Sequence, residues 1–176
     1  MTSSDTTQPL PADDLSRSLV VSDPAAPGLR HIFLAGGSYT ILVSGSQTQG
    51  KYCLIDMLVP AQGGPPPHRH DFEEAFTILE GSLEFTFRCQ THTVSAPATV
   101  AIPANAPHSF RNVSGKPAHM LCLCAGAGQE DFFATVGVLV PSRDAPPPVL
   151  SPAEQAEKRA LAESLAGQFR TEFLVG

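Results

Sequence analysis

Residues 63–81 of the chain read GGPPPHRHDFEEAFTILEG, and this stretch places two histidines just ahead of an apolar run. His68 and His70 are two positions apart, so in an extended chain their side chains lie on the same face. Glu74, four residues further on, has the same parity. The stretch therefore predicts two imidazoles and a carboxylate on one face of a β-strand region.

Residues 102–112, IPANAPHSFRN, supply a third histidine, His108, which a neighbouring strand would bring to the first group. Three imidazoles and one carboxylate are a ligand set typical of a divalent first-row transition metal. Because such a set leaves coordination positions open, it indicates a reactive site rather than a structural one. Glu73 is the competing carboxylate, but its parity points it to solvent. We therefore predict four metal ligands: His68, His70, Glu74 and His108.

The positions that share a face with these ligands are mostly apolar or aromatic. If the histidines point inward, the predicted lining of a substrate pocket above the metal is Phe76, Ile78, Phe85, Phe110, Met57 and Met120. Phenylalanines on one face of a strand are also typical of an ordinary core, and this interpretation stays open. The isolated histidines His31, His92 and His119 are interpreted as core or surface residues.

Short runs of branched and aromatic residues, separated by Gly and Pro, recur between Arg30 and Ala125. This pattern is typical of an all-β sandwich or barrel and favours a jelly roll. The predicted strands are residues 30–34, 38–44, 51–59, 74–80, 82–88, 92–94, 99–102, 108–112 and 118–125. Glu80-Gly81 lies between two of them and is expected to turn a tight hairpin.

Three regions follow from the change in composition along the chain. Residues 1–27, rich in Ser, Thr, Pro and Asp, predict a flexible N-terminal arm. Residues 28–140 are expected to form the β-domain. Residues 141–176 predict a proline-rich linker and a C-terminal helix packed on that domain.

Two helices are expected beyond the β region. Residues 129–136 predict a short helix. Ser151-Pro152-Ala153-Glu154 is a capping box with proline in the first turn, so a second helix should begin there. It is expected to run to about Ala166 and to stop at Gly167. Leu161 and Leu165 are one turn apart and are predicted to lie against the β-domain.

Composition limits the partners and the compartment. A net charge of −6 with only 11 Lys and Arg argues against binding of nucleic acid. No apolar run is long enough to span a membrane, and the N-terminus lacks the pattern of a secretory signal. We therefore expect a cytoplasmic protein that binds a small-molecule substrate. The cysteines at positions 53, 89, 122 and 124 form no CxxC pair and are expected to be reduced.

The two motif stretches resemble those of the cupin superfamily. The first cupin motif, H-x-H, three or four residues, E, six residues and G, corresponds here to His68, His70, Glu74 and Gly81. The second, P-x-G, two residues, H, three residues and N, corresponds to Pro103, His108 and Asn112. Asn105 replaces the glycine of that motif. Asparagine tolerates a left-handed backbone, so the turn is expected to survive.

The wider chain from Gly28 to Val175 resembles single-domain cupins similar to quercetin dioxygenases. This resemblance implies an all-β cupin jelly-roll barrel with a short C-terminal α-helical extension, and a homodimer that covers exposed edge strands. It implies one divalent metal, whether Fe, Mn, Ni, Co, Cu or Zn. It also implies a dioxygenase that cleaves a flavonol-like or other small aromatic or enolic substrate. Glu74 would accept the substrate's proton, since burial is expected to raise its pKa.

Two other function classes fit the same residues. One is a non-oxidative isomerase, epimerase or decarboxylase. A phosphosugar substrate would require Arg or Lys in the pocket, and the predicted inward positions of the strands carry neither. The other class is a non-catalytic module that binds metal and a small molecule. Fold and function remain separate inferences.

Overall fold

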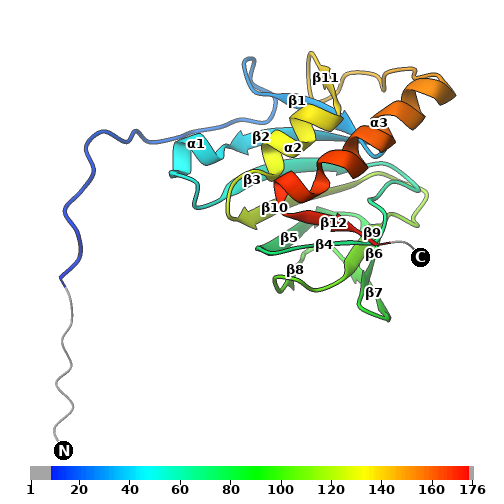
Figure 1. Cartoon of the computed structure of the whole chain (residues 1–176), viewed down its shortest axis with the longest axis horizontal. Coiled ribbons are helices and arrows are strands. Elements are labelled where there is room, and N and C mark those ends of the chain that lie inside the picture. Colours follow the sequence, from blue (N-terminus) through cyan, green and yellow to red (C-terminus); the bar gives the residue numbers. More distant parts are fainter. Residues whose placement is uncertain (1–8, 175–176) are drawn as a thin grey trace, which may run out of the picture.

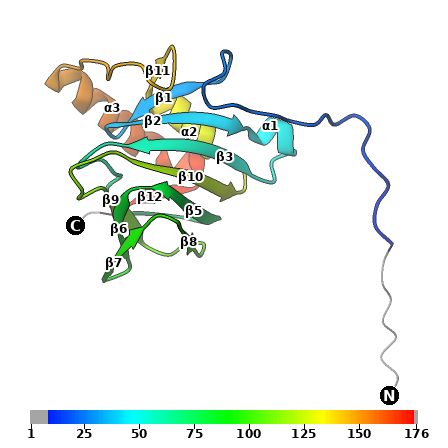
Figure 2. The same cartoon turned by 180° about the vertical axis from the view of Figure 1, so that it is seen from behind.

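Apolar and polar side chains alternate along most strands of the chain, and this alternation gives each sheet an inner and an outer face. The computed structural model describes residues 9–174 and contains two antiparallel sheets that face each other (Figures 1 and 2). The seven-stranded sheet has the order β11-β1-β2-β3-β10-β5-β8, and the five-stranded sheet has the order β12-β4-β9-β6-β7.

The elements have the following bounds. The seven-stranded sheet contains β1 (His31–Leu34), β2 (Gly37–Val43), β3 (Cys53–Val59), β5 (Glu73–Glu80), β8 (Ala98–Ile102), β10 (Ala118–Ala125) and β11 (Val138–Val140). The five-stranded sheet contains β4 (His68–His70), β6 (Ser82–Phe87), β7 (Gln90–Ser95), β9 (His108–Arg111) and β12 (Thr171–Phe173). The helices are α1 (Gly45–Thr48), α2 (Gln129–Val136), α3 (Pro152–Leu165) and the 3-10 helix η1 (Ala166–Phe169).

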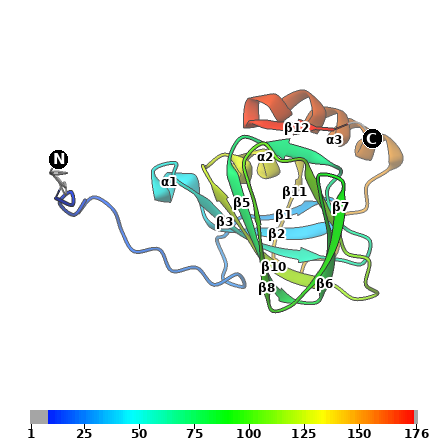
Figure 3. The ribbon, with the colours of Figure 1, turned by 90° about the horizontal axis from the view of Figure 1, so that it is seen from below.

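The core lies between the two sheets, whose ribbons Figure 3 shows from below. On β10, for example, Met120, Cys122 and Cys124 are buried, whereas Leu123 is 38% exposed. The expectation of an all-β jelly roll with a short C-terminal helix is confirmed. The predicted closure into a barrel is wrong, because no strand ladder among the described residues joins one sheet to the other.

Gly81 marks a crossing from one sheet to the other. The predicted tight hairpin at Glu80-Gly81 is wrong, since β5 lies in the seven-stranded sheet and β6 in the five-stranded sheet. Gly81 has φ +86°, and a Cβ there would lie 3.0 Å from the Cα of Ala118. A glycine therefore suits both the backbone conformation and the close approach of β10.

The helix α3 begins where the capping box predicts. Ser151 N donates to Glu154 Oε2 at 2.7 Å, and Glu154 N donates to Ser151 Oγ at 3.3 Å. The helix lies beside α2, on the side of the molecule away from β7 and β8 (Figure 1). No α3 residue is fully buried, and Leu161 is 39% exposed, so the prediction that Leu161 faces the β-domain is wrong.

The C-terminal strand β12 pairs with β4, the strand that carries two of the predicted metal ligands. Phe173 lies opposite His68, and Thr171 lies opposite His70. Neither β4 nor β11 was predicted as a separate strand, because three residues are too few to set the bounds of a strand. The end of the chain therefore lies directly beside the histidine motif.

Residues 9–29 contain no helix or strand and are mostly exposed. They contact the rest of the chain through a few hydrogen bonds, such as that from Ser22 Oγ to the carbonyl oxygen of Leu42 at 2.6 Å. The predicted flexibility of the arm stays a prediction, and residues 1–8 lie outside the described part of the chain. Among the helices of residues 9–174, none combines the length and apolar character needed to cross a bilayer.

Candidate metal centre

Strand β4 places two histidines on the inner side of the five-stranded sheet. His68 and His70 are buried, and Arg69 between them is exposed, as their parity predicts. His68 pairs directly with His108 of β9, so the third imidazole comes from the neighbouring strand. The three rings lie close together, with the centroids of His68 and His108 4.3 Å apart.

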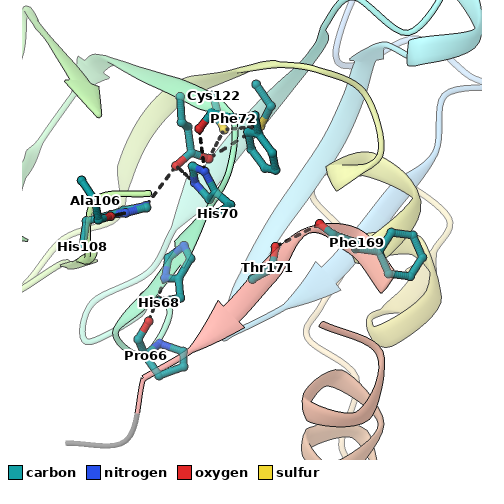
Figure 4. A network of polar contacts seen from close by, with 11 residues as sticks. Pro66, His68, His70, Phe72, Ala106, His108, Cys122, Phe169 and Thr171 are labelled. Atoms are coloured by element: carbon teal, nitrogen blue, oxygen red, sulfur yellow. Dashed lines mark hydrogen bonds and ion pairs between the residues drawn. The ribbon is translucent and has the colours of Figure 1, made fainter. Parts of the chain in front are cut away.

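The carboxylate comes from the opposite sheet. Glu74 of β5 is 5% exposed, whereas Glu73 is exposed. Glu74 Oε2 lies 3.1 Å from Nε2 of His70 and 3.2 Å from Nε2 of His108 (Figure 4). One donor atom from each of the four predicted ligands lies within 4.8 Å of the others, and all four residues are buried.

The second nitrogen of each imidazole contacts a backbone carbonyl. Nδ1 donates to Pro66 O at 2.9 Å in His68, to Phe72 O at 2.8 Å in His70, and to Ala106 O at 2.9 Å in His108. A carbonyl oxygen only accepts, so each Nδ1 carries the proton and Nε2 faces the cluster. This is the outer hydrogen bonding that orients histidine ligands of metals.

Burial keeps His68 in its neutral form. Desolvation, together with the nearby His108, lowers the pKa of His68 to about 4. The imidazole therefore offers a lone pair at neutral pH, as a metal ligand must.

The pKa of Glu74 differs from the value expected from the sequence. Burial raises the pKa of Glu74, but hydrogen bonds from His108 and His70 outweigh burial and hold that pKa below its usual range. The expectation of a raised pKa is therefore wrong, because the sequence did not reveal that two donors share one carboxylate oxygen. Glu74 is an ionised carboxylate near neutral pH.

These features fit a divalent metal ion. Three imidazoles and one ionised carboxylate converge, a backbone carbonyl orients each imidazole, and the ligands leave room for further coordination. The cluster can hold a metal ion, and the residue types do not determine which metal it is.

A cavity of about 1140 Å³ opens at His68 and Glu74. Met57, Phe76 and Phe110 line it, as the predicted pocket has them. The other three predicted pocket residues, Ile78, Phe85 and Met120, do not line it. All six residues are buried and belong to the core, since side-chain parity gives the face on which a residue lies but not whether it borders a cavity.

The sequence did not predict several residues of the cavity wall. Tyr39 of β2 is one, and its hydroxyl makes no hydrogen bond with the residues that the structure describes. Helix α3 forms another side of the cavity wall with Gln155, Lys158, Arg159, Ala162 and Glu163. These five residues recur at spacings of three and four positions, which places them on one face of the helix. The prediction used a different face, the one that carries Leu161 and Leu165.

A comparison with protein families matches residues 55–124 to the Cupin domain family, and this range includes all four residues of the cluster. The fold is a jelly-roll-like cupin fold, and the match and the fold together support the cupin superfamily. The comparison with curated proteins found no match.

Solved structures share this fold at low sequence identity. A protein from Thermotoga maritima described as a predicted oxalate decarboxylase is 20% identical, with a TM-score of 0.52 over 62% of this chain and 99% of that chain. The polyketide cyclase RemF from Streptomyces resistomycificus is 22% identical, with a TM-score of 0.47 over 64% of this chain and 78% of that chain. The similarity to the Thermotoga maritima protein concerns the fold alone.

Proposed function

We propose that this protein is a metal-dependent dioxygenase that cleaves a flavonol-like or other small aromatic or enolic substrate. The observation that carries the proposal is the position of the cluster: His68 and Glu74 lie in the wall of a large cavity whose neighbouring wall is aromatic and apolar. Sites of this shape hold small apolar molecules and orient them by a few polar groups.

His68, His70, Glu74 and His108 would hold one divalent transition metal. When bound, such a metal supplies Lewis acidity that lowers the pKa of a coordinated hydroxyl, and a redox-active metal also supports reaction with dioxygen. Since Zn has no redox activity, the proposal favours the redox-active candidates among Fe, Mn, Ni, Co, Cu and Zn.

Glu74 is the proposed proton acceptor. It is the carboxylate next to the histidines, and it borders the cavity. Because its pKa is held low, Glu74 is a weak base and matches only an acidic proton. A phenol or enol hydroxyl, which becomes more acidic in the site, therefore suits this residue better than an aliphatic alcohol.

Three side chains would hold the substrate ring. Phe76 and Phe110 meet edge to face with centroids 5.3 Å apart, a geometry that leaves ring surface for stacking. Tyr39 is buried, and burial raises its pKa, so it keeps its phenolic proton. Its hydroxyl is thus available to hydrogen-bond a substrate oxygen.

A second candidate function is a non-oxidative reaction on an acidic substrate, such as isomerisation or decarboxylation of a keto acid. The strands around the cluster bring no Lys or Arg to the cavity, but α3 brings Lys158 and Arg159. Lys158 Nζ already donates to Gly137 O at 2.8 Å, which leaves Arg159 as the freer cation for a carboxylate.

Reconstitution and a substrate screen test these proposals. Metal-free protein is reloaded separately with each of the six metals and incubated with flavonols, catechols and keto acids, while oxygen consumption and product formation are measured. Oxygen-dependent ring cleavage with a redox-active metal, and none with Zn, is the expected result. Intact aromatic substrates under all conditions would overturn the dioxygenase proposal, and conversion without oxygen uptake would favour the second candidate.

The variant E74Q separates an enzyme from a binding module. An enzyme that uses this carboxylate as its base should lose turnover far more than substrate affinity. In a non-catalytic binding module no turnover would be found in either protein. We also propose that the chain forms a homodimer through exposed edge strands, and sedimentation analysis would test this directly.

A further inference from the structure

Glu74 separates two sets of potential metal donors. Its Oε2 faces His70 and His108, whereas its Oε1 faces two buried thiols of β10. Cys122 Sγ lies 3.1 Å and Cys124 Sγ 3.6 Å from Oε1. Figure 4 shows Cys122 and His70 approaching the same carboxylate.

The strand register explains how these thiols converge. Cys124 pairs directly with Glu74 across β10 and β5, and Cys122 is two positions away on the same face. The two sulfur atoms lie 3.6 Å apart. The three residues are buried, and their donor atoms lie within 4.8 Å of one another.

The distances match those of a tetrahedral thiolate site. With metal–sulfur bonds of about 2.3 Å and a metal–oxygen bond of about 2.1 Å, tetrahedral angles place two sulfurs about 3.8 Å apart and sulfur and oxygen about 3.6 Å apart. The sulfur–sulfur separation of 3.6 Å and the sulfur–oxygen separation of 3.6 Å at Cys124 are close to these values, and the separation of 3.1 Å at Cys122 would lengthen by about 0.5 Å.

We propose that Cys122, Cys124 and Glu74 form a second metal site, which takes a thiophilic cation such as Zn²⁺ or Cd²⁺. Thiolate ligands favour such cations. Packing alone explains a buried cysteine, but it does not require two sulfurs to converge on one carboxylate oxygen. On binding, the two thiol protons that now point at Oε1 would leave and the cation would take their place.

The surroundings of the thiols support this site. Glu74 borders the cavity, so a cation that reaches the carboxylate lies next to both donor sets. A third thiol, Cys53 of β3, lies directly opposite Cys124 in the strand register. Cys89 is exposed and lies outside the cluster, which makes it a matched control.

Cadmium provides the test. Metal-free, full-length protein is titrated with Cd²⁺, and thiolate-to-metal charge-transfer absorption in the near ultraviolet is measured. X-ray absorption at the cadmium edge then identifies the neighbouring atoms. We expect the charge-transfer band and sulfur neighbours in the unsubstituted protein, loss of both in C122A/C124A, and retention of both in C89A and in H68A/H108A.

A cadmium neighbourhood of only nitrogen and oxygen in the unsubstituted protein would overturn the proposal, and this measurement needs no variant to fold. A band that survives in C122A/C124A, or one that disappears from folded H68A/H108A, would overturn it as well. The readout does not depend on turnover, so failure of the dioxygenase proposal would leave the cadmium result unchanged.

Discussion

The backbone amide of Asn105 donates a hydrogen bond to the carbonyl oxygen of His70, with nitrogen and oxygen 2.7 Å apart. This bond joins the loop before His108 to the end of β4. Asn105 has φ +67°, in the left-handed region. The turn that brings the third histidine to the first two therefore depends on a conformation that asparagine and glycine tolerate.

We expect N105G to retain the stability of the unsubstituted protein and N105V to lose about 1–2 kcal/mol, because a branched side chain is strained in this conformation. Urea unfolding of the metal-free proteins measures the difference. Equal stability of N105V and N105G would show that the left-handed turn is not under strain.

Single substitutions of the histidines should strongly reduce metal retention at the histidine cluster. We expect H68A, H70A and H108A each to lose most of the bound metal, because the remaining three donors bind less tightly. Elemental analysis of purified protein measures the content. The control is H92A on the exposed strand β7, which should retain the metal content of the unsubstituted protein. Fe, Mn, Ni, Co or Cu that stays bound after loss of His108 would contradict the assignment, whereas Zn held by the thiols proposed above would not.

Tyr39 should affect the reaction and not the fold. Its hydroxyl makes no hydrogen bond within residues 9–174, so Y39F is expected to change the free energy of unfolding by less than about 0.5 kcal/mol. If the hydroxyl holds the substrate, kcat/KM should fall about tenfold, the value of one hydrogen bond. Unchanged kinetics with an accepted substrate would remove Tyr39 from the proposed site.

Glu130 links α2 to the first residue of α1. Its carboxylate accepts from Gly45 N at 2.6 Å and from Gly128 N at 2.9 Å. Burial raises the pKa of Glu130, but these two amides outweigh burial and lower it below the ordinary value of 4.5. The folded chain therefore binds this proton less readily than the unfolded chain, so the stabilisation is present above about pH 4.5 and is lost as the pH falls below it.

We expect E130Q to lose about 1–3 kcal/mol of stability at pH 7, since the amide group cannot accept both hydrogen bonds equally well. The difference from the unsubstituted protein should shrink in acid. Urea unfolding at pH 7 and at lower pH measures it, with E157Q, at an exposed position of α3, as the control. A deficit of E130Q that stays constant with pH would contradict the role of this carboxylate.

Local patterns predicted much of the site. The parity of His68, His70 and Glu74 placed these side chains on the inner faces, and the capping box at Ser151 placed the start of α3. Asn105 adopted the left-handed conformation that its place in the motif required. Each of these features depends on a few neighbouring residues, so the sequence alone carries the information.

Features that depend on distant segments were not predictable in the same way. A glycine after a strand is compatible both with a hairpin within one sheet and with a crossing to the other sheet. Gly81 alone therefore did not indicate which of the two would form. The pKa of Glu74 depends on imidazoles from two other strands. The face of α3 that borders the cavity depends on where the helix docks, which its own periodicity does not specify.

The four cluster residues are divided between the two sheets, with the three histidines on β4 and β9 and Glu74 on β5. No ladder of backbone hydrogen bonds connects these layers within residues 9–174. A cation held by all four donors would therefore act as a clasp between two sheets that share no strand ladder in the described part of the chain. Loading the metal should slow amide exchange in β5 and β9 to a similar degree, because neither sheet could then separate from the other without releasing the ion.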